Sequence, residues 1–287
     1  MELTRNYAKT CDLPDFSDPE LAALMPEIAP AAGRVPPHRK YWEFASAALF
    51  FRDAGVLRED AKILDLGAGH EELLYWLAKH TGRVYALDIY GRGDFAGLEA
   101  DGAFVENPAA FAPYPYPEDR LEVVDADARS LPFEDESMDA VVSCSSVEHM
   151  GDLRELGTVM SEVRRVLRPG GVAYIATEVF LKWSPLNARP VGVLAKALTG
   201  GRRAPGATLR KRAIDVLTPG EIRRHLVRGT GLELMQPLRI EVSDEARRHP
   251  VRVLGPETVV EHDGQPHIVV GVPGGEFTSI GLPLRRT

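Results

Sequence analysis

The sequence predicts an α/β protein built on a doubly wound, mostly parallel sheet. An apolar strand, a glycine-rich turn and an amphipathic helix follow one another in AKILDLGAGHEELLYWLAKH, residues 61–80. From about residue 60 to 180, apolar strands alternate with helical patterns, which is typical of right-handed crossovers in a parallel sheet. A last apolar segment, EFTSIGLPLRR, predicts a terminal strand.

The first part of the chain has a different composition. Residues 1–37 are rich in Pro, Ala and Asp, with one short helical pattern in DPELAALMPEIA. We expect them to form an arm or lid, and we assign a single domain to residues 38–287. Its first helix, in PPHRKYWEFASAALFFRDAG, has Tyr41 and Phe44 among its apolar positions at helical spacing, and it ends at Gly55,.

The remaining elements follow from apolar runs and breaker residues. The buried strands expected in chain order are 61–67, 82–91, 120–128, 137–146 and 171–180,. A helix over 151–167 stops at RPGG, where Gly170 can take the left-handed conformation,. A helix at 218–231 and a strand at 232–242 come later. The stretches at about 90–118 and 181–215 show no such pattern, and we expect them to be insertions on the substrate side.

Composition limits the classes of partner. The net charge of −8 argues against nucleic-acid binding, which usually needs a cationic face,. Two cysteines far apart in sequence favour a reducing compartment,. No apolar run reaches the ~20 residues of a membrane helix, and the first residues lack an apolar signal core,. We therefore expect a cytoplasmic protein without a membrane span, and its oligomeric state stays open.

The glycine turn carries the first chemical information. Gly67 and Gly69 let the backbone approach a ligand that a Cβ would exclude,, but the third glycine of the dinucleotide fingerprint is absent. Asp65 ends the strand, and Glu71 and Glu72 begin the helix. These carboxylates would repel a pyrophosphate and suit an ammonium or sulfonium group. The charge pattern thus favours S-adenosylmethionine over NAD or ATP.

Two aspartates follow the next strands. Asp88 ends the second strand, 21 residues after Gly67, where a carboxylate can accept both ribose hydroxyls of a nucleoside,. Asp127 follows the third strand, in DADARSLPF, where it can accept from an adenine amino group. The alternatives are a turn-capping Asp88 and an Asp127 in an ordinary surface turn.

The ordered segments ILDLGAG, ALDIYG, DADARSLPF, MDAVVSCSSVEHM and VLRPGGVAYIATE closely resemble class I S-adenosylmethionine-dependent methyltransferases over about residues 58–180. The resemblance implies a seven-stranded, Rossmann-like sheet whose last strand is antiparallel. It also implies Asp65, Gly67 and Gly69 around the methionine moiety, Asp88 on the ribose, and Asp127 with Ala128 at the adenine. S-adenosylhomocysteine is the product of such enzymes. The flanks HRKYWEF, AAFAPYPYPEDRL and EFTSIGLPLRR resemble, more loosely, bacterial O-methyltransferases associated with glycan or glycolipid biosynthesis.

The cofactor contacts expected from these patterns are Asp65, Gly67, Ala68, Gly69, Asp88, Ile89, Asp127, Ala128, Cys144, Ser145 and Tyr41. Tyr41 or Arg39 can reach the methionine carboxylate. The alternative for Tyr41 is packing of its helix into the core.

The acceptor side should lie after the fourth strand, in SSVEHMGD. His149 is the expected general base because a neutral imidazole is available near pH 7. Its alternative is a capping or packing role at the next helix. Glu148 is expected to orient the imidazole or bind the acceptor, and Asp152 and Glu178 are further carboxylates near this edge. The residues lack a metal-ligand spacing, so a divalent metal is possible in principle but not indicated.

The expected reaction is O-methylation of a sugar or a glycan or glycolipid intermediate. The alternative is N- or carboxyl-methylation of another small molecule, a natural product or a protein side chain. Either a phosphate contact or a solvated loop would explain the basic residues Arg202, Arg203, Arg210, Lys211 and Arg212,. Tyr114 and Tyr116 can stack on a sugar or wedge their loop against the sheet, and we expect Trp76 to be a packing residue.

Overall fold

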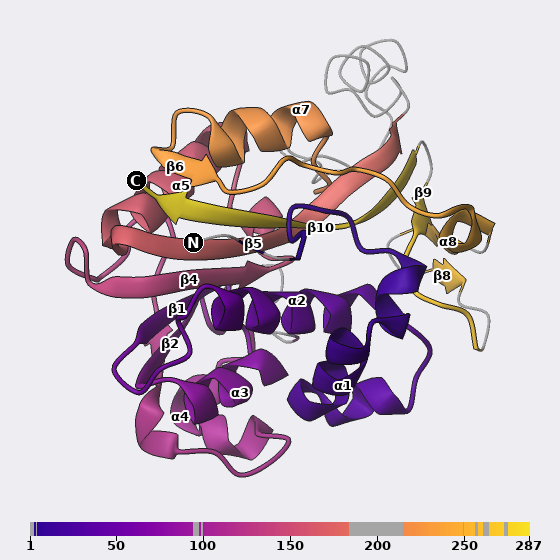
Figure 1. Ribbon diagram of the computed structural model, residues 1–287. Coiled ribbons are helices and arrows are strands. Elements are labelled where there is room, and N and C mark those ends of the chain that lie inside the picture. Colours follow the sequence, from indigo (N-terminus) through magenta and orange to yellow (C-terminus); the bar gives the residue numbers. More distant parts are fainter. Residues whose placement is uncertain are drawn as a thin grey trace, which may run out of the picture.

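The structure of the chain is a computed structural model (Figure 1). It describes residues 3, 5–93, 98, 100–183, 215–248, 250–255, 258–260, 264–272 and 275–287. The predicted basic cluster at 202–212 and most of the predicted insertion at 181–215 lie outside these ranges.

A central sheet forms the framework of the molecule. Its strands run in the order β3 (Leu121–Asp125), β2 (Arg83–Asp88), β1 (Lys62–Leu66), β4 (Met138–Cys144), β5 (Leu167–Trp183) and β10 (Gly275–Arg286). The first five are mutually parallel, and β10 is antiparallel to β5. The short β6 (Leu232–Leu234) pairs with β10. The predicted doubly wound, mostly parallel sheet with an antiparallel last strand is thereby confirmed.

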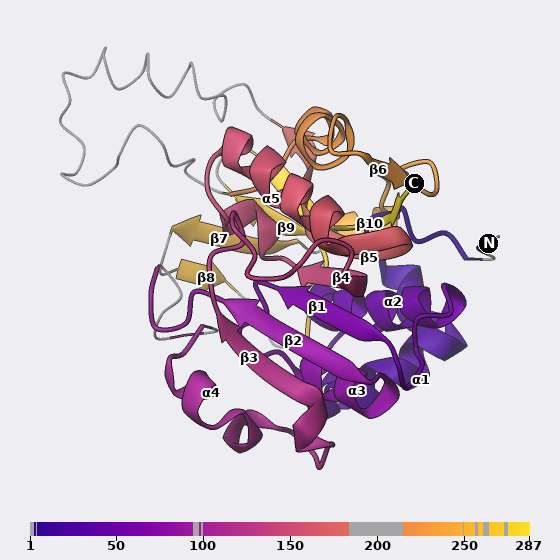
Figure 2. The same ribbon diagram turned by 90° about the vertical axis from the view of Figure 1, so that its left-hand side faces the viewer.

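Three further strands lie beyond β10 and make the sheet larger than expected. They are β9 (Val270–Val272), β7 (Val251–Gly255) and β8 (Thr258–Val260), which give ten strands in the described structure. β9 is antiparallel to β10 and parallel to β7, so the direction of the strands changes more than once at this side. Figure 2 shows these strands next to β10.

Helices cover both faces of the sheet (Figures 1 and 2). One face carries α1 (Pro19–Ile28), α2 (Arg39–Asp53) and α3 (Glu72–His80), and the other carries α5 (Leu153–Val166), α7 (Pro219–Glu221) and the π-helical turn η7 (Ile222–Val227). The peripheral elements are α4 (Ala103–Glu106), α8 (Asp244–Arg248), and the 3₁₀ turns η1 (Leu13–Ser17), η2 (Pro30–Gly33), η3 (Pro108–Phe111), η4 (Glu118–Arg120) and η5 (Val147–His149). Each face has its own apolar core, so each edge loop is held between two packed layers.

The limits of α5 follow from its sequence. Asp152 and Glu155 form a capping box at the start of the helix,. The helix ends at Val166, and Leu167 is already extended. The helix predicted over 151–167 is thus confirmed to within two residues at either end. Gly170 does have a φ of +78°, but it lies within β5 and does not end the helix.

The N-terminal arm is packed against the domain. Tyr7 and Cys11 are buried, and the Tyr7 hydroxyl donates a hydrogen bond to Asp53 at the end of α2. Bridges join Lys9 to Arg239 and Thr10 to Ile280. The arm thus crosses β10 beside α2. Among the described residues, no helix is long and apolar enough to cross a membrane.

Candidate functional site

The glycine turn after β1 is tightly enclosed. Gly67 has a φ of +73° and Gly69 a φ of +48°. A Cβ on Gly67 would lie 2.5 Å from Ser146 Cβ and 2.6 Å from Met150 Cε. The Ser146 hydroxyl donates to the Gly67 carbonyl over 2.8 Å. The turn therefore needs glycine at position 67, and it is fixed to the segment that follows β4.

Asp65 lies at the end of β1 directly under this turn. Its side chain is fully buried, and among the described residues neither carboxylate oxygen has a hydrogen-bond partner. Burial raises the pKa of Asp65 to about 7, with Lys40 opposing the rise and Asp88 adding to it. A buried carboxylate without a donor is costly, so this group is suited to a ligand that brings an N–H or a positive charge.

Asp88 holds the turn from the neighbouring strand. Its carboxylate accepts from the backbone N–H of Gly69 over 3.0 Å and of Ile89 over 2.7 Å. Burial raises its pKa, and these two hydrogen bonds oppose the rise. Each carboxylate oxygen has a second lone pair for a further donor, and Ile89 is half-exposed beside it. Asp88, the residue predicted to bind the ribose, is thus held in place by the same backbone that forms the turn.

Asp127 lies past β3 at the same edge of the sheet. It is half-exposed and forms an ion pair with Arg129 over 2.6 Å. The Arg129 hydrogen bond holds the pKa of Asp127 below its usual range. Ala128 beside it is buried. The carboxylate is therefore ionised and already paired with Arg129. A ligand at Asp127 would have to share this carboxylate with Arg129.

A buried charge network that the sequence reasoning missed lies across the strand ends. The Lys40 ammonium forms an ion pair with Glu71 and lies 3.8 Å from Glu43. Arg39 pairs with Glu178 and lies 3.3 Å from Glu43. Burial alone would lower the pKa of Lys40, but Glu71 and Glu43 outweigh it and raise the pKa above its ordinary value. The signal was the spacing of Arg39 and Lys40 from Glu43 at one helix face.

The residues after β4 connect this network to the turn. The carbonyl of Cys144 accepts from Lys40 Nζ over 2.6 Å. Ser145 has a φ of +52°, and its hydroxyl donates to Glu43 over 2.8 Å. A positive φ at a non-glycine residue is uncommon and often marks a functional turn. Cys144 and Ser145 therefore have polar groups engaged by α2, and their predicted contacts with the cofactor stay predictions.

Tyr41 lies on α2 beside these charges. Its ring centroid is 5.6 Å from that of His38, and the side chain is partly buried against the core. Burial, with a smaller contribution from Glu72, raises its pKa. This packing accords with the alternative weighed for Tyr41, and its predicted contact with the cofactor stays a prediction.

Glu148 is buried at the end of β4. One oxygen accepts from the Thr177 hydroxyl over 2.9 Å, and the other, Oε1, has no hydrogen-bond partner in the part of the chain that the structure describes. Burial raises the pKa of Glu148 to about 7, Glu178 adds to the rise and His149 opposes it. The side of the edge predicted to hold the acceptor therefore has a buried carboxyl oxygen that can still accept a hydrogen bond.

His149 is next in the chain and is about one-third exposed. Its Nδ1 lies 3.2 Å from Asp215 Oδ2, on the segment that returns to β5. Burial lowers its pKa, but the Asp215 hydrogen bond and the charge of Glu148 outweigh this, so the pKa lies above 6.5. Asp215 was not expected from the sequence either, because nothing local in the chain links it to His149.

The aromatic residues singled out in the sequence are mainly packing residues. The Tyr114 hydroxyl donates to the Ile28 carbonyl over 3.0 Å, and Tyr116 packs edge-on against Tyr75. Trp76 is buried and donates to Glu27, as expected for packing. The two tyrosines thus wedge their loop against α1 and α3.

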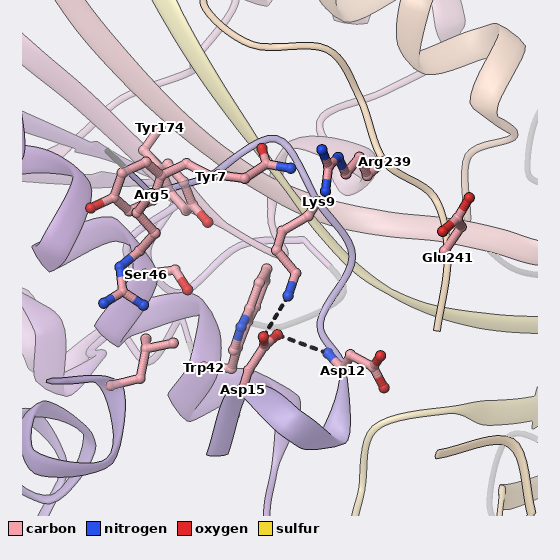
Figure 3. Close-up of a pocket in the computed structure, with 12 residues that line it drawn as sticks. Arg5, Tyr7, Lys9, Asp12, Asp15, Trp42, Ser46, Tyr174, Arg239 and Glu241 are labelled. Atoms are coloured by element: carbon pink, nitrogen blue, oxygen red, sulfur yellow. Dashed lines mark hydrogen bonds and ion pairs between the residues drawn. The ribbon is translucent and has the colours of Figure 1, made fainter. Parts of the chain in front are cut away.

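Two other features bear on ligand binding, the grouping of metal-ligating side chains and a cavity beside the N-terminal arm. Within the described ranges, no three His, Cys, Asp or Glu side chains are grouped to hold a metal ion. A cavity of about 360 Å³ lies between the N-terminal arm, α2 and β5 (Figure 3). In it, Asp15 accepts from Lys9 and from the backbone of Asp12, so these charges are partnered within the protein.

Comparison with known proteins identifies the family of the domain that carries this edge. Residues 64–175 match the family model described as a methyltransferase domain. The chain contains a class I S-adenosylmethionine-dependent methyltransferase domain.

Relatives of this methyltransferase domain are diverse. It is 36% identical over 115 residues to the methyltransferase GfsG of Streptomyces halstedii, which is 40% of this chain and 37% of that protein. It is 32% identical over 111 residues to the ubiquinone/menaquinone biosynthesis C-methyltransferase UbiE of Brucella anthropi, which is 38% of this chain and 37% of that one. The matches span little more than a third of these relatives, so they do not assign an acceptor.

A solved structure shows the same fold over most of the chain. It belongs to a provisionally assigned sarcosine dimethylglycine methyltransferase of Galdieria sulphuraria, with a TM-score of 0.51 and 17% identity. The alignment covers 93% of this chain and 98% of that one. At this identity the likeness shows the methyltransferase fold alone.

Proposed function

We propose that this chain transfers the methyl group of S-adenosylmethionine to a hydroxyl of a sugar or of a glycan or glycolipid intermediate, with His149 as general base. The observation that carries the proposal is the His149–Asp215 pair at 3.2 Å, next to the buried Glu148 and across the sheet edge from the glycine turn. An imidazole in this position can take a proton from a weakly acidic hydroxyl.

The donor side fits the expected cofactor. Asp65 has two buried oxygens without a hydrogen-bond partner among the described residues, and it lies beside the turn in which Gly67 and Gly69 both have a positive φ. We propose that Asp65 and the turn Gly67–Gly69 hold the methionine moiety, that Asp88 and Ile89 hold the ribose, and that Asp127 and Ala128 lie at the adenine. When bound, S-adenosylmethionine supplies an electrophilic methyl group.

The remaining predicted contacts line the same edge. Cys144 and Ser145 present backbone and hydroxyl groups between α2 and the turn. We propose that Lys40, by neutralising Glu71, keeps this buried edge from repelling the methionine carboxylate,. Tyr41 stays a proposed contact from α2.

On the acceptor side, this chain's residues orient the hydroxyl and move its proton. The neutral imidazole of His149 accepts the proton at Nε2 while Nδ1 is engaged by Asp215,. Glu148 Oε1, which has no partner, accepts a hydrogen bond from a second polar group of the acceptor. Arg39 holds Glu178 away from that oxygen through their ion pair.

One observation favours an amine as the alternative acceptor. The unpartnered Glu148 oxygen and the nearby Glu178 would suit an ammonium group as well as a polyol. A curated relative that is 33% identical over 111 residues is a sarcosine/dimethylglycine N-methyltransferase of Aphanothece halophytica. N- or carboxyl-methylation of a small molecule, natural product or protein side chain therefore stays the second candidate.

The test is a transfer assay with methyl-labelled S-adenosylmethionine against nucleotide sugars, oligosaccharides and small amines. We expect label in a carbohydrate, and His149→Ala should lower the rate by about 10²–10⁴-fold while S-adenosylhomocysteine still binds. His80→Ala, at the far end of α3, is the control. Label only in amines, or full activity of His149→Ala, would overturn the proposal.

We propose a cytoplasmic location for this activity. Both cysteines, Cys11 and Cys144, are buried and free. Such thiols are typical of reducing compartments, and fractionation of the expressing cells tests the location.

A further inference from the structure

The segment around Asp215 is fixed to the sheet independently of the site. Leu217 forms a parallel bridge with Val179, and its N–H donates to the Glu178 carbonyl over 3.0 Å. The Phe180 N–H donates back to Leu217 over 3.0 Å. Val216 and Leu217 are buried, and Thr218 begins α7 with a capping box. The carboxylate of Asp215 is therefore placed by a segment bridged to β5.

His149 approaches from the other side. It ends the 3₁₀ turn η5, whose Val147 and Glu148 are buried, so the turn is anchored on its inner face. His149 Nδ1 and Asp215 Oδ2 meet at 3.2 Å across 66 residues of sequence. A contact between two separately anchored elements is preorganised, because neither partner needs to be ordered by the other.

We propose that Asp215 is a positioning residue that accepts a hydrogen bond from His149 Nδ1–H and so fixes the tautomer in which Nε2 carries the lone pair. In neutral imidazole only one ring nitrogen bears the proton, and the partner of one nitrogen sets the role of the other. The inference rests on the proposed function, in which Nε2 takes the proton of the acceptor.

The carboxylate also sets the charge balance around the ring. The groups that face His149 are Glu148 on its own turn, Glu178 at the end of β5 and Asp215 on the return segment. Arg39 already pairs with Glu178, and Glu148 is itself partly protonated near pH 7 because burial raises its pKa to about 7. Asp215 is thus the group that most directly stabilises the imidazolium after proton uptake.

The decisive measurement needs no acceptor. Two-dimensional ¹H–¹⁵N spectra of the full chain report the tautomer and titration of His149 directly. We expect the Nδ1–H form in the native chain, a mixed or Nε2–H form in Asp215→Ala, and a lower His149 pKa in Asp215→Asn. Asp60→Asn, an exposed carboxylate before β1, is the control and should leave His149 unchanged.

Kinetics with the acceptor found in the transfer screen complete the test. Asp215→Asn should lower kcat about 10–100-fold with little change in S-adenosylhomocysteine affinity, and shift the acid limb of the pH profile to lower pH. Asp215→Glu should restore part of the rate.

An unchanged His149 tautomer and titration in both Asp215 variants would overturn the inference, whatever the activity. Full activity of His149→Ala would instead overturn the proposed function, while the spectra would still show whether Asp215 holds the ring. The two failures are therefore distinguishable.

Discussion

The Lys40 ammonium and the Glu71 carboxylate form an ion pair that joins α2 to the start of α3 across the end of β1. The same ammonium donates to the carbonyl of Cys144 at the end of β4. One cation thus connects three elements that surround Asp65. Since Glu71 and Glu43 both lie in the interior, the charge of Lys40 stabilises the fold even without a ligand.

Lys40→Met should destabilise the fold because it leaves the buried Glu71 carboxyl group without its ion-pair partner. We expect a loss of about 2–3 kcal/mol in the free energy of unfolding, below the cost of breaking a fully buried pair because the Lys40 side chain is 29% exposed,. Urea denaturation measures it. Adding Glu71→Gln should recover much of the loss, and a double variant as unstable as Lys40→Met alone would contradict this account.

Asp88→Asn should weaken S-adenosylhomocysteine binding by about 10–100-fold, because hydrogen bonds to a charged acceptor contribute about 1.5–3 kcal/mol. Asparagine keeps the size of the side chain and one acceptor for the turn. Calorimetry is the measurement. Asp125→Asn, the paired position on β3, is the matched control and should bind normally. Equal affinities for the native chain and Asp88→Asn would remove Asp88 from the ribose site.

Gly67→Ala should both destabilise the domain and abolish cofactor binding. The new Cβ would lie 2.5 Å from Ser146 Cβ at a φ of +73°, and overpacking of this kind costs about 1–3 kcal/mol. Gly157→Ala in α5 is the contrast, since beyond its own helix backbone no atom of the described residues lies within 4 Å of the added Cβ, and it should stabilise by about 0.5–1 kcal/mol. Thermal unfolding of both variants measures these changes in stability. If Gly67→Ala leaves the stability unchanged, the close packing of Gly67 against Ser146 is refuted.

His38 predicts an acid-sensitive contact at the start of α2. Its Nδ1 accepts from the Lys40 N–H over 3.1 Å, and its ring stacks on His267 at 4.3 Å. Burial, with His267, Arg39 and Lys40 nearby, lowers the pKa of His38 to about 3. Between pH 6.5 and 3 the unfolded chain binds a proton there that the folded chain excludes. This stability is thus complete above pH 6.5 and is lost as the pH falls toward 3.

Asn is also a good helix N-cap, so His38→Asn tests whether the His38 ring causes the acid sensitivity without removing the N-cap of α2. Its free energy of unfolding should fall less than that of the native chain between pH 7.5 and 5, measured in urea. Parallel curves for the two proteins would contradict the assignment to His38.

The sequence predicts those parts of the fold that are formed by long apolar runs. β1, β2, β4 and β5 came from such runs, and their ends fall at one edge because parallel strands end together. This is why Asp65, Gly67 and Asp88 were expected as neighbours and are neighbours. By contrast, β7, β8 and β9 have five, three and three residues, too few for a periodicity, and the strand expected at 232–242 shrinks to Leu232–Leu234 ahead of Pro237.

The site residues that were missed depend on contacts between distant segments. Asp215 meets His149 across 66 residues, and Glu43 meets Ser279 across 236. No local pattern encodes such pairs, because the packing of whole elements brings them together. Lys40 had a weaker signal, since a charged residue on an otherwise apolar helix needs a partner in the interior.

The bridge between Val179 and Leu217 fixes the register of the segment that carries Asp215 against β5. Two backbone hydrogen bonds hold this register, from Leu217 N–H to the Glu178 carbonyl and from Phe180 N–H to the Leu217 carbonyl. Because successive residues of an extended segment point to opposite faces, a shift of one residue would turn the Asp215 side chain to the other face of the sheet. The distance between Asp215 and His149 therefore depends on backbone pairing at a place where neither side chain takes part.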